Sequence, residues 1–143
     1  MVADDILRRK GRDTITVAPD ATLREAADTL AEYNIGALVV TSDDGTVAGV
    51  LSEHDVVQTL SDRGADALTV TVREVVTGEV LTCTPEDDVK ALMERVTRRR
   101  ARHLPVVQDG TVDGVISVGD LLKTRLEEME TERKVLQDRL LDC

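Results

Sequence analysis

The sequence predicts an α+β fold in which a β-α-β-β-α unit occurs twice. The two units are expected to pack sheet to sheet with approximate two-fold symmetry, with a helix following at the C-terminal end. The first observation is a glycine–aliphatic–aliphatic–serine–x–x–aspartate motif, written at residues 49–55 and again at 114–120. The second is that strand-like and helix-like hydrophobic spacing alternates in the same order ahead of each copy.

The repeat extends far beyond the motif. Thr16 and Thr82 are 66 residues apart, whereas the two motifs are 65 apart, because Asp44 has no counterpart in the second copy. Neither unit alone covers both faces of a small sheet, so the two are expected to share a buried aliphatic core. We therefore divide the chain into a first repeat at 2–68, a second repeat at 69–126 and a C-terminal helical extension at 127–143.

The first repeat contains recognisable caps and turns. Thr22, with Glu25 three residues later, is a helix N-cap pattern, and Asp44-Gly45 is a hairpin-turn step. The expected elements are helix 3–7, basic loop 8–13, strand 14–17, helix 22–33, strand 37–41, strand 46–51, helix 52–61 and linker 62–69.

The second repeat follows the same order. The expected elements are a short helix at 72–76, strand 80–83, helix 88–99, strand 103–107, strand 111–117 and a helix from 119 onward.

Composition limits the possible functions. The chain has 143 residues, no Trp or Phe and a net charge of −10, which argues against a general binder of nucleic acid or anionic membranes. Cys83 and Cys143 do not suggest a disulfide framework and fit a reducing compartment. No apolar run reaches membrane-spanning length and no signal peptide is evident, so a cytoplasmic location is expected.

Each motif indicates a strand, a cap and a helix. Ser52 and Ser117 stand at N-cap positions, and Asp55 and Asp120 follow in the first helical turn. A hydroxyl and a carboxylate beside unpaired backbone N–H groups also suit a phosphorylated ribose. Capping alone is the alternative explanation for each pair, but the duplication favours a binding role.

Two β-α-β-β-α repeats that each end in this motif resemble the tandem cystathionine-β-synthase (CBS) domain pair. The second copy fits best, with Arg-His-Leu-Pro-Val-Val at 102–107 and Asp-Gly at 109–110 ahead of its motif. The resemblance covers residues 2–126 and looks like a stand-alone pair with no catalytic, channel or transporter domain attached.

The resemblance implies a regulatory sensor of adenosine-containing ligands, with AMP favoured and ADP, ATP, NAD(H) or S-adenosylmethionine as alternatives. In similar proteins the motif aspartate accepts hydrogen bonds from the ribose hydroxyls, in one of two clefts between the repeats. One cleft would use Thr16, Ile35, Gly36, Val115, Ser117 and Asp120, with Arg102 reaching the phosphate. The other would use Thr82, Ala101, His103, Val50, Ser52 and Asp55, and His54 and Pro105 complete the candidate set.

The first repeat departs from the family pattern. Gly36-Ala37 stands where the second repeat has Arg102-His103, so phosphate neutralisation is expected from the second repeat, with 98–100 as helpers. These arginines also fit a solvated helix end, and His103 also fits the edge of a core. Neither metal-ligand spacing nor a catalytic motif is present, so no metal, catalytic cofactor or enzyme activity is expected.

The tail carries apolar residues at heptad spacing from Leu122 to Leu140, interrupted by Arg133. It either packs on its own domain or pairs with a second chain, and we favour a homodimer. The expected function is a nucleotide sensor that signals to an unknown protein target. The alternative is a dimeric interaction scaffold whose clefts are vestigial.

Overall fold

The computed structural model describes residues 1–76 and 79–141 of the chain. It contains two small sheets, one in each half of the molecule. In the first sheet, β1 is parallel to β2, and β2 is antiparallel to β3. The second is an antiparallel pair. The strands are β1 (Thr16–Val17), β2 (Ala37–Thr41), β3 (Val47–Ser52), β4 (His103–Gln108) and β5 (Thr111–Ser117).

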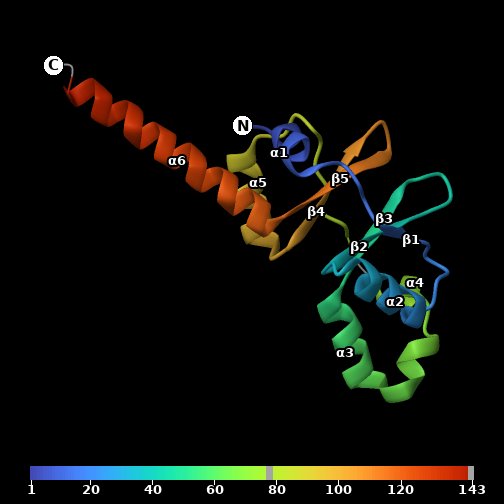
Figure 1. Ribbon diagram of the computed structural model, residues 1–143. Coiled ribbons are helices and arrows are strands. Elements are labelled where there is room, and N and C mark those ends of the chain that lie inside the picture. Colours follow the sequence, from blue (N-terminus) through green and yellow to red (C-terminus); the bar gives the residue numbers. More distant parts are fainter. Residues whose placement is uncertain (77–78, 142–143) are drawn as a thin grey trace.

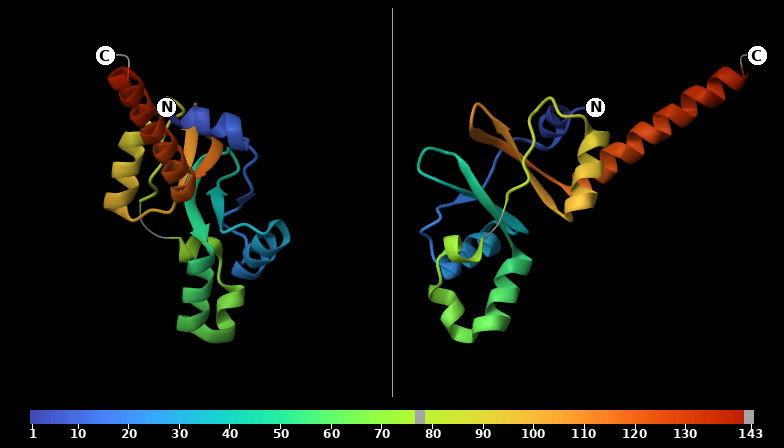
Figure 2. Two further views of the ribbon diagram at one scale, coloured as in Figure 1. Left: turned by 60° about the vertical axis from the view of Figure 1, so that its left-hand side comes forward. Right: turned by 180° about the vertical axis from the view of Figure 1, so that it is seen from behind.

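Helices cover both sheets, which confirms the predicted α+β fold (Figures 1 and 2). Thr22 caps α2 as expected, because its hydroxyl accepts the Glu25 N–H at 3.1 Å. The helices are α1 (Ala3–Lys10), α2 (Leu23–Tyr33), α3 (Glu53–Arg63), the 3₁₀ helix η1 (Gly64–Thr69), α4 (Val72–Val75), α5 (Val89–Arg99) and α6 (Val118–Leu141).

Two predicted boundaries are wrong. Residues 8–10 belong to α1 rather than to a loop. Acidic side chains in its first turn and basic ones in its last turn suit the helix dipole. The predicted linker at 62–69 is helical, because α3 runs to Arg63 and η1 follows directly. Because both segments are helices rather than loops, the directions of their charged side chains are fixed by the helix.

The predicted strand at 80–83 is also wrong, and only a single bridge from Cys83 to Val106 remains. Cys83 N–H donates to Pro105 O at 3.0 Å, and Val107 N–H donates to Cys83 O at 2.7 Å. In the first repeat Val17 pairs with Val40 in the same parallel sense. The two repeats therefore share the same parallel pairing, but the counterpart of β1 in the second repeat is only the bridge at Cys83.

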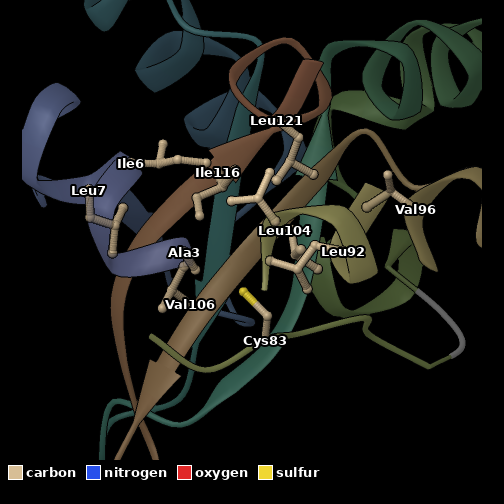
Figure 3. Close-up of a cluster of buried hydrophobic side chains, with 11 residues drawn as sticks. Ala3, Ile6, Leu7, Cys83, Leu92, Val96, Leu104, Val106, Ile116 and Leu121 are labelled. Carbon is tan, nitrogen blue, oxygen red and sulfur yellow. The ribbon is translucent and has the colours of Figure 1, made fainter. Parts of the chain in front are cut away.

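The two hydrophobic cores do not follow the order of the sequence. Ala3, Ile6 and Leu7 of α1 pack with α5, β4 and β5, far along the chain (Figure 3). In return, Val72 of α4 packs into the core formed by α2, β2 and β3, which Ala67 of η1 also joins. Each repeat thus completes its core with a helix that precedes the other repeat.

Equivalent glycines receive the two exchanged segments. A Cβ atom on Gly114 would lie only 2.6 Å from Leu7 Cδ2, and one on Gly49 would overlap with Val76 Cγ1. Glycine is therefore required for the close approach at both positions. The matching contacts make Leu7 and Val76 structural counterparts, although the sequence repeat does not align them clearly.

The last helix, α6, has 24 residues and extends away from the two sheets (Figures 1 and 2). Its first turns are held by the buried Leu121 and Thr124. Further along, Leu126, Met129 and Leu136 are more than half exposed. No helix in the described part of the chain is both long and apolar enough to cross a membrane. Cys143 lies outside the described residues.

Candidate functional site

The two motifs form the same reciprocal cap. Ser52 N–H donates to Asp55 Oδ2 at 2.8 Å, and Asp55 N–H donates to Ser52 Oγ at 3.2 Å. The corresponding distances for Ser117 and Asp120 are 2.9 and 3.1 Å. Capping is therefore a real role of both pairs. It uses the Oδ2 atom of each carboxylate, so it does not prevent Oδ1 from accepting another hydrogen bond.

A cavity of about 660 Å³ lies between the repeats on the Asp55 side, and we call it the larger cleft. Its volume falls within the usual range of small-molecule sites, about 300–1,000 Å³. It brings together most of the candidate residues from both repeats. The candidates on its wall are Gly36, Val50, Ser52, His54, Asp55, Ala101, Arg102 and His103.

The larger cleft has charges of both signs on its wall. Arg100 and Arg102 come from the segment after α5, whereas Glu53 and Asp55 come from the first turn of α3. Arg100 has a φ of 54°, which ends α5 in the left-handed conformation and turns the chain towards β4. The Arg102 carbonyl accepts the Val118 N–H at 2.9 Å, which fixes this segment against the start of α6.

His103 lies on the walls of both cavities. Its burial lowers the pKa of the imidazole, and the nearby Lys10 and Arg102 lower it further, against the opposing influence of Asp120 and Glu53. The neutral form is therefore favoured at neutral pH. A neutral imidazole offers one donor and one acceptor to a bound molecule.

The second cavity, which we call the smaller cleft, has a volume of about 240 Å³. Ile35, Gly36, Val115 and Ser117 lie on its wall as predicted, together with Lys10. Other candidates lie elsewhere. The wall residues do not include Thr16 or Asp120, Arg102 faces the larger cleft, and Thr82 and Pro105 line neither cavity.

The sequence analysis missed Lys10. Its Nζ atom donates to Asp120 Oδ2 at 2.8 Å and to the Val115 carbonyl at 2.9 Å. Burial raises the pKa of the Asp120 carboxyl, but hydrogen bonds from Lys10 and Ser117 outweigh it, and the net pKa is lowered. The basic run at 8–10 could have indicated that α1 continues to Lys10, because cations are favoured at the C-terminal end of a helix.

Groups suited to metal binding are absent from residues 1–76 and 79–141, where no three His, Cys, Asp or Glu side chains cluster appropriately. Cys83 is buried, and burial raises the pKa of its thiol to about 12. Such a thiol is packed as a small apolar group rather than poised as a nucleophile.

Comparison with known proteins agrees with the fold. The chain spans 66% of the mitochondrial CBS domain-containing protein CBSX3 of Arabidopsis thaliana and is 29% identical to it over 136 residues, 90% of this chain. A solved CBS-domain protein from Agrobacterium tumefaciens is 42% identical, with a TM-score of 0.81 over 87% of this chain and 99% of that one.

The fold also matches the CBS domain pair of protein MJ0100, solved with 5′-methylthioadenosine and S-adenosyl-L-methionine. That likeness has a TM-score of 0.77 at 22% identity and covers 90% of this chain and 98% of the other. The CBS domain family itself matches twice, at residues 3–62 and 72–127. The two matches cover most of the chain, and the protein therefore belongs to the CBS domain family.

Proposed function

We propose that this protein is a regulatory module that binds an adenosine-containing ligand in the larger cleft. The observation that carries the proposal is the position of Asp55, whose carboxylate lies on a cavity wall shared with Arg100 and Arg102. A carboxylate suits the two hydroxyls of a ribose, and guanidinium groups suit a phosphate. Together they match the two polar ends of a nucleoside monophosphate.

The two arginines on the wall favour an adenosine ligand that carries a phosphate, and among these we put AMP first. The MJ0100 domain pair was solved with two adenosine derivatives that carry no phosphate. Arg100 and Arg102 of this chain add local positive charge despite the overall negative charge. A phosphate next to these guanidinium groups gains charge-assisted hydrogen bonds that a sulfonium compound lacks. NAD(H), ADP and ATP share the required groups and are the next candidates.

Ligand binding in this cleft would be coupled to the relative position of the two repeats. Its wall contains β3 and α3 residues of the first repeat and residues 100–103 of the second. A ligand that contacts both sides stabilises one arrangement only to the extent that it binds that arrangement more tightly. We therefore assign a regulatory rather than a catalytic role, with a protein target that senses the arrangement.

The test is a thermal-shift panel with AMP, ADP, ATP, NAD⁺, NADH, S-adenosylmethionine and GTP. A ligand at about one hundred times its dissociation constant adds about 2.7 kcal/mol of stability, a rise of several degrees for a chain of this size. We expect the largest shift with AMP and none with GTP.

Asp55→Ala should lose this shift, whereas Asp62→Ala, an exposed change on the same helix, should keep it. Because Asp55 also helps to cap α3, each shift is measured against the same variant without ligand. Flat traces for wild type across the panel would contradict the proposal.

A second proposal concerns assembly, and the exposed apolar residues of α6 favour it. Leu126, Met129 and Leu136 follow heptad spacing and are 57%, 51% and 60% exposed. We propose that this stripe pairs with the same stripe of a second chain. Light scattering should then report a dimer that Leu126→Glu dissociates and Thr131→Glu, on the opposite face of α6, leaves intact. A wild-type monomer would refute this assembly.

A further inference from the structure

The smaller cleft already contains a cation that belongs to the chain itself. Lys10 reaches across from the last turn of α1, and its ammonium bonds both the Asp120 carboxylate and the Val115 carbonyl. Asp120 is the counterpart of Asp55, the residue to which we assign the ribose. The group that would receive the sugar hydroxyls is therefore engaged by an internal donor.

Among residues 1–76 and 79–141, no side-chain cation reaches Asp55 at the larger cleft. Leu7 and Val76 are counterparts because they contact the equivalent glycines, and three residues beyond them stand Lys10 and Glu79. Glu79 lines the larger cleft and pairs with Arg99 at 3.6 Å. A glutamate cannot donate a hydrogen bond to Asp55, so this aspartate stays available. Counted from these two residues, the sequence offers a lysine at one cleft and a glutamate at the other.

We infer that Lys10 is a tethered cation that closes the smaller cleft against the adenosine ligand for which the family resemblance provides this second site. The choice of ligand class rests on the proposed function, whereas the closure rests only on the contacts of Lys10. Four of the other wall residues, Ile35, Gly36, Val115 and Ser117, are among those that the family resemblance places around such a ligand. Wild-type protein should therefore bind one ligand per chain.

Two physical features make closure by Lys10 effective. The lysine is attached to a helix whose Ile6 and Leu7 are anchored in the core, so the ammonium has a high effective concentration at Asp120. The ammonium bonds Oδ2, the oxygen that the cap also uses, so it opposes a ligand by lying beside the carboxylate and the Val115 carbonyl rather than by occupying Oδ1. The Lys10 and Asp120 side chains are 40% and 28% exposed, however, so the contact is accessible to solvent and can open without disturbing the core.

The inference is tested by titration calorimetry of the full chain with AMP. Lys10→Ala removes the closing group, and Lys123→Ala, an exposed lysine on α6, is the matched control. We expect one AMP per chain for wild type and for Lys123→Ala, and two for Lys10→Ala. In Lys10→Ala/Asp120→Ala the number should return to one. Lys10→Met, which keeps the aliphatic stem, replaces Lys10→Ala in all comparisons if the alanine variant does not fold.

The outcomes separate this inference from the proposed function. One AMP in both wild type and Lys10→Ala overturns the closure by Lys10 and leaves the larger cleft as the site. No binding to wild type with one AMP per Lys10→Ala chain supports the closure and overturns the assignment of the larger cleft. Two AMP molecules in wild type overturn the closure, and no binding to either protein overturns both.

Discussion

The two clefts are built from equivalent parts and yet offer different sites. Both have a serine–aspartate cap with nearly the same hydrogen-bond lengths. The cavity beside Asp55 has a volume of about 660 Å³, whereas the cavity on the other side has about 240 Å³. Residues outside the motifs also differ, among them Lys10 at the end of α1 on one wall and Glu79 after α4 on the other.

This comparison shows where a duplicated protein can specialise. Each cap stabilises the helix that it begins, so its residues are constrained in both copies. Lys10 is the last residue of α1 and Glu79 follows α4, and both side chains are exposed, so a change of charge there disturbs neither core. Such positions can alter a ligand site at little cost in stability. Three measurements test the comparison.

The largest effect is expected from Leu7→Ala. Leu7 is fully buried against the second core, so its truncation should lower the free energy of unfolding by about 2–5 kcal/mol. Val76→Ala should cost less, because Val76 is smaller and only partly buried. Chemical denaturation measures both values. Equal losses would show that α1 and the segment after α4 are docked equally well, contrary to the structure.

A smaller effect is expected from the caps. Ser52→Ala and Ser117→Ala each remove one side-chain acceptor from a helix N-terminus, which costs about 1 kcal/mol. Because the two caps have the same geometry, the two losses should agree within experimental error. A clearly larger loss for one of the two variants would show that the two caps differ in energy despite their matching geometry.

The smallest effect is expected from His103 and depends on pH. Its pKa in the folded state is below the ordinary value of about 6.5, so the unfolded chain binds more protons as the solution becomes acidic. The contribution of His103 to stability is therefore complete above about pH 6.5 and falls as pH drops through the folded pKa.

Urea denaturation between about pH 7.5 and 5.5 measures this slope. His103→Gln should flatten it, and His54→Gln serves as the control for losing a histidine from the same cavity wall. An unchanged slope in His103→Gln would mean that the pKa of His103 is the same in the folded and unfolded chains, contrary to its burial in the structure.

Local patterns in the sequence were sufficient to predict the repeat, the helix caps and most of the strands. Strands β2 and β5 have the predicted bounds, because their β-branched residues are framed by turns with Asp-Gly steps. The predicted strand at 80–83 failed, since its pairing consists of one bridge around Cys83. A local pattern indicates that a segment is extended, but it does not show how many partners the segment finds.

The part of the site that the sequence analysis missed, the contact of Lys10 with Asp120, depends on residues that are far apart in the sequence. No local signal indicates that α1 packs on the second repeat, and without that exchange Lys10 could not be placed near Asp120. Arg102 was expected at the smaller cleft but faces the larger one. Its direction is set by the left-handed turn at Arg100, a tertiary feature that an arginine-rich run does not reveal.

The length of α6 has a mechanical consequence. The helix starts at the Ser117–Asp120 cap, beside the Lys10 contact, and its 24 residues span about 36 Å. At that length, a tilt of about 10° at the cap would move the far end by about 6 Å. A small rotation at the cleft therefore becomes a displacement at the far end of α6 that is large enough for a partner protein to detect.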